Sequence, residues 1–300
     1  MSVVDIRSSR RRNRVPVTIA LPPYAHVYEL VSGDLDLPGI EPTFVELPSP
    51  SLGRSGDAGD YDVTDVPLLD YVTRRLAGDR TLTAVPVFTS RGFAHGSVGV
   101  RAASTPEELR GARIGTDWSD TASVYVRGML AELHGVDSAG VQWSEGADDA
   151  DAVIAPLASL PDGFARLLDP PGESERDFYC RTGVFPILRV LVVRSELLDE
   201  HRWLASNLYR AFEVARRRFY ARAGDIRASR VPIPSLAAHV DRLRDFFGGD
   251  IAPYGVEPNR VTLEAFVRYA VEQRLVEAPP ADVAELFAPV EPFVDYTDGV

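Results

Sequence analysis

Two side chains that can hold an anion and move a proton lie four residues apart in the segment 89–97, Thr-Ser-Arg-Gly-Phe-Ala-His-Gly-Ser. Arg91 carries a planar fork of N–H donors that binds both oxygens of a carboxylate. His95 carries an imidazole that titrates near neutral pH, so it can donate a proton to a reacting carbon. The segment therefore predicts a carboxylate anchor beside a proton donor. The structural alternatives are a salt bridge for Arg91 and a histidine bonded to a backbone carbonyl for His95.

Four further candidates for contact with a small molecule stand in two early loops. Tyr24 and His26 follow the first predicted strand, while Thr64 and Asp65 lead into an amphipathic helix. Loops that follow strands hold the ligand sites of open α/β sheets. His26 is equally explained as a partly buried structural histidine, and Asp65 as a cap of the following helix.

Hydroxyl groups and a cation occur at three positions later in the chain. Ser119 and Thr121 open a predicted helix, where free N–H groups and the helix dipole attract an anion. Capping explains Ser119 equally well. Arg189 lies on a long predicted strand and would add a cation to the site, unless it points from a solvated face.

Strands and helices alternate along the chain, which is typical of α/β lobes with mostly parallel sheets. A helix with acids in its first turn is predicted to begin after Thr105 and to end at Gly111. The apolar patterns predict strands at 15–21, 81–88, 112–116, 141–143, 151–155 and 184–194. They predict helices at 24–31, from Thr64 to 76, and at 119–134, 173–179, 197–221, 235–247, 263–274 and 283–287.

This order predicts two lobes joined by two crossovers, near residues 96–102 and 185–195, with a cleft between them. Clefts between lobes are preferred ligand sites. We expect a flexible basic leader at 1–14, a first lobe at 15–96 and 195–300, and a second lobe at 97–194.

Composition excludes several classes of function. The formal net charge of −12 repels polyanions and gives no support to nucleic-acid binding. The chain contains no lysine, which removes Schiff-base and P-loop lysine chemistry. Its single cysteine, Cys180, permits no internal disulfide and is expected to be buried. We expect no metal site, since no ligand spacing is evident, and no membrane span. A cytoplasmic protein is expected.

Several motifs resemble those of the 4,5-dihydroxyphthalate decarboxylase family, which has the type II periplasmic-binding-protein fold. They are Ser-Arg-x-Phe-x-His at 90–95, Thr-Ala-x-x-x-x-Arg-Gly at 121–128, Thr-Gly-Val-Phe-Pro-Ile at 182–187 and Pro-Tyr-Gly-Val-Glu-Pro-Asn-Arg at 253–260. The matches run from about Tyr24 to the end. The departures are Tyr24-Ala25-His26 in place of Tyr-Asp-Arg, Arg189 in place of histidine, and a short segment at 144–151.

The resemblance implies a carboxy-lyase without a cofactor that acts on a small hydroxylated aromatic or cyclic polycarboxylate. In this hypothesis His95 donates the proton, and Arg91, Thr121 and Arg189 hold carboxylates. His26 or Asp65 engages ring hydroxyls. The remaining substrate contacts are Tyr24, Thr64, Ser90, Ser119 and Phe185.

Two other functions fit the same cleft. One is a dehydratase or other lyase that acts on a chorismate-like acid, and the other is a solute-binding protein without catalysis. The sequence leaves the substrate and a homo-oligomeric state open.

Overall fold

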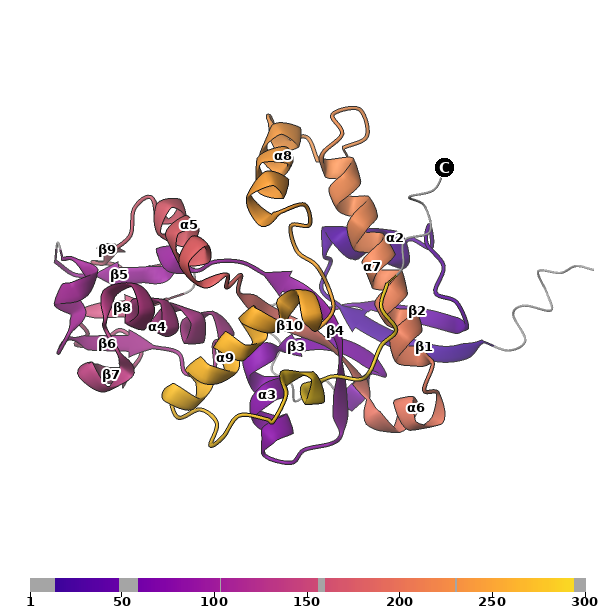
Figure 1. Cartoon of the computed structure of the whole chain (residues 1–300), viewed down its shortest axis with the longest axis horizontal. Helices are drawn as coiled ribbons and strands as arrows, with labels where there is room; N and C mark the ends of the chain where they lie inside the picture. Colours follow the sequence, from indigo (N-terminus) through magenta and orange to yellow (C-terminus); the bar gives the residue numbers. More distant parts are fainter. Residues whose placement is uncertain (1–13, 49–58, 103, 156–159, 230, 294–300) are drawn as a thin grey trace, which may run out of the picture.

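The computed structural model describes residues 14–48, 59–102, 104–155, 160–229 and 231–293 of the chain. Within these ranges, two five-stranded sheets lie toward opposite ends of the long axis, with helices packed around them (Figure 1). Residues 1–13 of the expected leader lie outside the described residues.

The first sheet has the strand order β2-β1-β3-β10-β4. Its strands β1, β2 and β3 are parallel, whereas β10 is antiparallel to both β3 and β4. Strand β10 is apolar except for Arg189 and Arg194, because both of its faces are covered. The bounds are β1 Val15–Leu21, β2 Ile40–Glu46, β3 Val63–Pro67, β4 Leu82–Arg91 and β10 Ile187–Arg194.

The second sheet has the order β7-β6-β8-β5-β9. Strand β6 is parallel to β7 and β8, and β5 is antiparallel to β8 and β9. The bounds are β5 Val98–Val100, β6 Arg113–Thr116, β7 Gln142–Glu145, β8 Ala152–Ile154 and β9 Ala165–Arg166.

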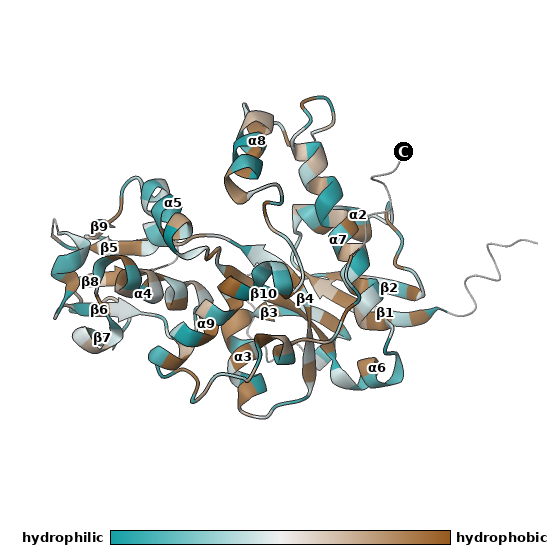
Figure 2. Cartoon of the chain, viewed as in Figure 1, coloured by the Kyte–Doolittle hydropathy of each residue, from teal (hydrophilic) through white to brown (hydrophobic). Residues whose placement is uncertain are grey.

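Helices cover the sheets, and α8 projects from the body at the top of Figure 1. The α-helices are α2 Tyr28–Val31, α3 Leu68–Leu76, α4 Thr121–His134, α5 Pro171–Thr182, α6 Ser195–Glu200, α7 Leu204–Ala223, α8 Leu236–Phe247 and α9 Arg260–Glu272. The 3-10 turns include η1 Ala25–Val27, η4 His95–Ser97, η5 Pro106–Leu109, η6 Ser138–Gly140, η7 Glu257–Asn259 and η8 Val283–Leu286. Figure 2 shows hydrophobic residues along β3, β4 and β10 and hydrophilic residues on outer helices such as α5.

The chain passes between the sheets twice, as expected. It leaves the first sheet after β4 and enters the second at β5, so the first crossover occupies residues 92–97. It returns between the end of α5 and the start of β10, at residues 183–186. The range 97–194 expected for the second lobe therefore includes β10, which is a strand of the first sheet.

Two strands of the first sheet carry patterns that the sequence did not reveal. Strand β2 contains Pro42, which an edge strand tolerates because one side of its backbone needs no partner. Strand β3 immediately precedes α3, and the prediction of a helix from Thr64 to 76 was wrong for residues 64–67, which belong to the strand. The expected helix at 197–221 is broken at 201–203 into α6 and α7.

Candidate active site

One edge of the first sheet collects the candidate residues. Because β1 is parallel to β3, and β10 is antiparallel to both β3 and β4, the carboxyl ends of β1, β3 and β4 lie together. The amino end of β10 lies at the same edge. Tyr24, Asp65, Arg91 and Arg189 come from these four segments, at the place where α/β sheets bind ligands.

The Asp65 carboxylate binds three neighbouring side chains at this edge. Its Oδ2 accepts hydrogen bonds from Tyr24 Oη at 2.8 Å, Thr89 Oγ1 at 2.8 Å and Arg189 Nε at 2.9 Å. The Asp65 side chain is 0% exposed and that of Arg189 is 9% exposed. Burial, followed by the Asp65 charge, raises the pKa of Tyr24. We call these four residues the Asp65 network.

The strand register explains why Asp65 and Arg189 meet. Asp65 stands opposite Leu191 on β10, and Arg189 lies two residues before Leu191, on the same face of the strand. The ion pair rules out both structural alternatives. Arg189 is buried rather than solvated, and the cap position of α3 is Pro67 rather than Asp65.

Arg91 is held by backbone and amide oxygens and retains an unpaired donor. Its Nη1 donates to Asn259 Oδ1 at 2.7 Å and to the Pro253 carbonyl at 3.3 Å, and its Nη2 donates to the Phe185 carbonyl at 2.8 Å. The guanidinium carbon lies 4.4 Å from the centroid of the Phe185 ring. Nε is buried without a partner among the described residues. Burial lowers the pKa of Arg91 to about 10, so it stays charged at neutral pH.

A buried arginine on α7 forms a second charged group near Arg91. Arg216 is 2% exposed and donates to Glu213 Oε1 at 2.7 Å and to Asp250 Oδ1 at 2.6 Å. Its guanidinium lies 5.3 Å from the ring centroid of Tyr254. The Tyr254 hydroxyl is buried and has no hydrogen-bond partner in the described part of the chain. We call these four residues the Arg216 cluster.

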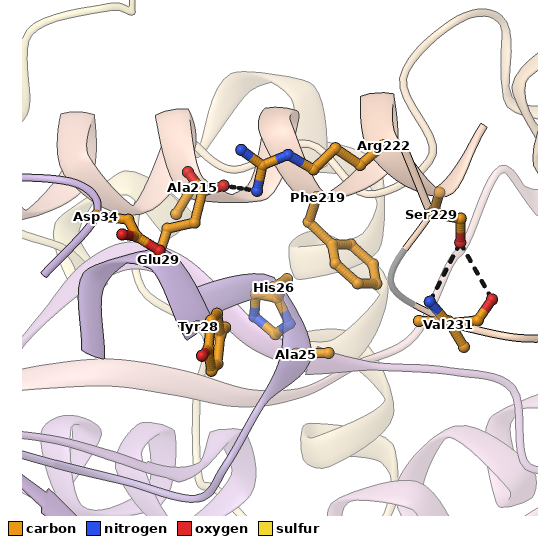
Figure 3. Close-up of a pocket in the computed structure, with 11 residues that line it drawn as sticks. Ala25, His26, Tyr28, Glu29, Asp34, Ala215, Phe219, Arg222, Ser229 and Val231 are labelled. Atoms are coloured by element: carbon orange, nitrogen blue, oxygen red, sulfur yellow. Dashed lines mark hydrogen bonds and ion pairs between the residues drawn. The ribbon is translucent and has the colours of Figure 1, made fainter. Parts of the chain in front are cut away.

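His26 lies between the Asp65 network and the Arg216 cluster. Its ring stacks on Tyr24 at a centroid distance of 5.4 Å, and its Nε2 is buried without a partner among the described residues. Burial, and then the charge of Arg216, lowers the pKa of His26 to about 4. The imidazole is therefore neutral at pH 7. His26 also lines a pocket of about 470 Å³ between η1, α2 and the end of α7 (Figure 3).

His95 has a more enclosed environment at the first crossover. It is 2% exposed, its Nδ1 lies 2.9 Å from Ser174 Oγ, and its ring meets the edges or faces of Phe93 and Phe178. Burial lowers the pKa of His95 to about 4. Phe93 also contacts Phe185, on which Arg91 stacks. Two aromatic rings thus separate the imidazole of His95 from the guanidinium of Arg91.

The start of α4 touches the first lobe. The hydroxyl of Thr121 is buried and accepts a hydrogen bond from the Leu69 amide at 3.3 Å. Ser119 is exposed and bonded to Asp117, and the cap of α4 is Asp120, which accepts from two amides of the first turn. The expectation that Ser119 caps this helix is wrong, because the helix begins two residues later.

The other three sequence candidates serve the framework of the site. The Thr64 hydroxyl donates to the Ala20 carbonyl at 2.8 Å, which ties β3 to β1. Ser90 stands opposite Arg189 in the sheet register. The ring of Phe185 stacks on Phe247 at 4.8 Å and provides the surface beneath Arg91.

Sequence reasoning missed five residues that the structure brings to this region. They are Thr89, Glu213, Arg216, Tyr254 and Asn259. One signal was available in the sequence. Glu213 and Arg216 stand three residues apart on the apolar face of α7, where a buried pair of opposite charges needs an explanation.

Three structural findings bear on the other expectations. Among the described residues, no three His, Cys, Asp or Glu side chains are grouped as metal ligands would be. Within the same ranges, none of the helices has the length and apolar character of a membrane span. Cys180, which we expected to be buried, is exposed on α5.

Comparison with known proteins identifies relatives over most of the chain. A 4,5-dihydroxyphthalate decarboxylase of Comamonas testosteroni is 30% identical over 302 residues, which cover 85% of this chain and 91% of that protein. A 4,5-dihydroxyphthalate decarboxylase of Pseudomonas putida is 34% identical over 139 residues, 45% of this chain and 54% of that protein. No family model matches the chain.

Solved structures share the fold at low identity. The aliphatic sulphonate binding protein SsuA of Escherichia coli is 15% identical, with a TM-score of 0.52 over 91% of this chain and 97% of its own. A ligand-binding component of an import system from Staphylococcus aureus is 12% identical, with a TM-score of 0.52 over 93% and 97%. The desulfurization enzyme DSZB is 16% identical, with a TM-score of 0.50 over 92% and 97%. The expected two-lobed binding-protein fold is therefore confirmed.

Proposed function

The chain belongs to the 4,5-dihydroxyphthalate decarboxylase family, and from that premise we propose that it removes carbon dioxide from a small aromatic dicarboxylate that carries hydroxyl groups. The reaction breaks the bond between the ring and one carboxyl carbon. The electron pair of that bond stays on the ring carbon, which takes up a proton. The site must therefore hold an anion, accommodate an aromatic ring and supply one proton.

The observation that supports this function most directly is Nε of Arg91, which is buried and has no partner among the residues that the structure describes. Buried polar groups in native proteins almost always have partners, so a buried donor without one marks the place of a missing ligand or water. Nη1 of the same guanidinium is occupied, while Nη2 makes one hydrogen bond to a carbonyl and so keeps one hydrogen. Nε–H and that second hydrogen of Nη2 can together donate two hydrogen bonds to a carboxylate.

Aromatic side chains provide the surroundings for a ring. Phe185 lies beneath Arg91, and Phe93 and Phe247 contact Phe185 at centroid distances of 5.1 and 4.8 Å. A second arginine, Arg216, lies in the same region, because its charge adds to the effect of burial in lowering the pKa of Arg91. Arg216 is itself paired with Glu213 and Asp250, so we assign the substrate carboxylate to Arg91.

We assign the proton transfer to His26, which has an unpaired ring nitrogen and lines a pocket. In the protein without substrate its pKa of about 4 keeps the imidazole neutral. A bound carboxylate nearby favours the charged form, so substrate binding raises this pKa and lets the imidazole take up a proton. His26 then donates that proton to the ring carbon. His95, preferred from the sequence, stays the competing assignment.

The test is to measure carbon dioxide release by the purified protein from 4,5-dihydroxyphthalate. Phthalate, which lacks the hydroxyls, and chorismate serve as comparison substrates. We expect release from the dihydroxy compound and none from phthalate. Binding of 4,5-dihydroxyphthalate without release would contradict the proposal and favour a solute-binding protein. Conversion of chorismate without release would favour the alternative lyase.

A further inference from the structure

The pocket in Figure 3 borders the proposed catalytic site but extends away from it. It holds about 470 Å³, within the range of about 300–1,000 Å³ that is usual for sites of small molecules. His26 belongs to both places, since its ring also stacks on Tyr24 of the Asp65 network. The lining residues are Ala25, His26, Tyr28, Glu29, Asp34, Ala215, Phe219, Arg222, Ala223, Ser229 and Val231.

The walls of this pocket fit a flat ring. His26 and Phe219 meet nearly edge to face at a centroid distance of 6.4 Å and form one aromatic corner. Ala25, Ala215 and Ala223 add small apolar side chains. Small side chains next to aromatic ones leave room for an aromatic ligand, which packs well in offset or edge-to-face contact with such rings.

The polar groups of the pocket do not suit an anion. The one guanidinium in its described lining, Arg222, forms an ion pair with Glu29, and Arg218 pairs with the same carboxylate at 3.2 Å. Asp34 adds a further acid at the rim. A carboxylate bound here would lose its hydration without gaining an uncommitted cation, which is costly.

An uncharged hydroxyl group fits the Nε2 atom of His26. The Nε2 of His26 is buried and unpaired among the described residues. A phenolic hydroxyl can donate to this nitrogen in one tautomer of the imidazole and accept from it in the other. A hydroxyl also costs far less to bury than a charge does.

We propose that this pocket binds the hydroxyl-bearing edge of a phenolic ring, as a site distinct from the carboxylate anchor at Arg91. The assignment of the phenol to the substrate rests on the proposed function. In that arrangement neutral His26 bonds the hydroxyl edge as the substrate binds, and Arg91 holds a carboxylate. His26 gives up this hydrogen bond before it transfers a proton to the ring carbon. The enzyme would then recognise the two kinds of substituent with two different surfaces.

The experiment is isothermal titration calorimetry with two fragments of the substrate class. Catechol carries the hydroxyls without carboxylates, and phthalate carries the carboxylates without hydroxyls. Ala25→Leu fills the pocket from an exposed position in η1. The control is Ala139→Leu, an exposed alanine in η6, a 3-10 turn of equal length in the other lobe. Circular dichroism checks that each variant is folded.

We expect Ala25→Leu to weaken catechol binding at least tenfold and to leave phthalate binding unchanged, with no effect of Ala139→Leu on either. His26→Phe keeps a flat ring and removes the nitrogen, so it should weaken catechol binding by roughly 2- to 10-fold, the value of one hydrogen bond. Equal catechol binding by the wild type and both pocket variants would overturn the proposal. So would an absence of catechol binding to the wild type.

The outcomes separate this proposal from the proposed function. If catechol binding depends on Ala25 but no acid releases carbon dioxide, the pocket assignment stands and the decarboxylase assignment fails. If 4,5-dihydroxyphthalate is decarboxylated while catechol binds Ala25→Leu as well as the wild type, the enzyme assignment stands and the pocket assignment fails.

Discussion

His26 and His95 have the same low pKa of about 4, and burial is the main cause for both. Their surroundings nevertheless differ. His95 is enclosed by Phe93 and Phe178 and is bonded to Ser174. His26 lines a pocket, and one of its nitrogens has no partner among the described residues. The imidazole of His95 lies between aromatic rings with one nitrogen bonded to a serine, whereas the imidazole of His26 lines a pocket and retains a nitrogen without a partner in the described part of the chain.

This difference shows that a shifted pKa by itself does not identify a catalytic group. Burial lowers the pKa of any histidine, whether it packs in a structural role or faces a substrate. The additional observation that favours His26 is that it lines a pocket and carries a buried nitrogen without a partner among the described residues. The predictions below either separate the two histidines or test the groups that support each one.

The largest effect is expected on turnover. His26→Ala should lower kcat for 4,5-dihydroxyphthalate by about 10²–10⁴-fold, the usual contribution of general acid catalysis. His95→Ala should lower it by less than about tenfold, because that ring contacts side chains of the fold. Steady-state kinetics at pH 7 measures both values on samples shown to be folded. The reverse order of effects would restore His95 as the proton donor.

The next effect is expected on the free energy of unfolding. Asp65 holds Tyr24, and the ring of Tyr24 stacks on His26. Asp65→Ala leaves the buried guanidinium of Arg189 without its carboxylate, and breaking such a pair costs about 3–5 kcal/mol. Urea denaturation measures the change in the free energy of unfolding. The control is Asp36→Ala, which breaks an ion pair between Arg14 and an aspartate that is 70% exposed, with an expected loss below about 1 kcal/mol. Equal losses for Asp65→Ala and Asp36→Ala would show that the Asp65 network contributes little to the free energy of unfolding.

Much of the fold could be predicted because its apolar patterns are strong. The strand at 15–21 and the strand along 184–194 are visible from the sequence, since strands that are buried on both faces form continuous apolar runs. Strand β2 was missed because its proline and its alternating exposure are typical of an edge. The expected end of the second lobe, at residue 194, was wrong because it included β10. The sequence of a strand does not reveal which of two sheets the strand joins.

The candidate site could be predicted only in part. Position after a strand selected Tyr24, Asp65 and Arg91, and the structure brings all three to one edge of a sheet. Sequence does not reveal how side chains pair. Arg189 and Asp65 were expected to bind substrate, but the structure shows them bound to each other. Arg216 was missed because an arginine within a long helix normally faces solvent.

A moderate effect is expected on substrate affinity. Arg91→Gln removes the charge of the carboxylate anchor, and a hydrogen bond to a charged group contributes about 1.5–3 kcal/mol. We therefore expect KM for 4,5-dihydroxyphthalate to rise about 10- to 150-fold, while the binding of catechol, a ligand without carboxylates, changes little. Arg101→Gln is a control, because that arginine stacks on Phe164 in the second lobe. A KM unchanged by Arg91→Gln would exclude it as the anchor.

The last effect is a change per pH unit in the free energy of unfolding, and it tests the enclosure of His95. Because its folded pKa of about 4 lies below its ordinary value of 6.5, the unfolded chain binds more protons between these limits. The free energy of unfolding should therefore fall as pH drops from 6.5 to 4, by about 1.4 kcal/mol per pH unit for this group. His95→Asn should remove that share of the slope, whereas His239→Asn, on the exposed surface of α8, should not. Urea denaturation at several pH values measures the slopes. Equal slopes for wild type and His95→Asn would mean that the ring gains a proton without leaving its enclosure, and the contrast between the two histidines would then lose its physical basis.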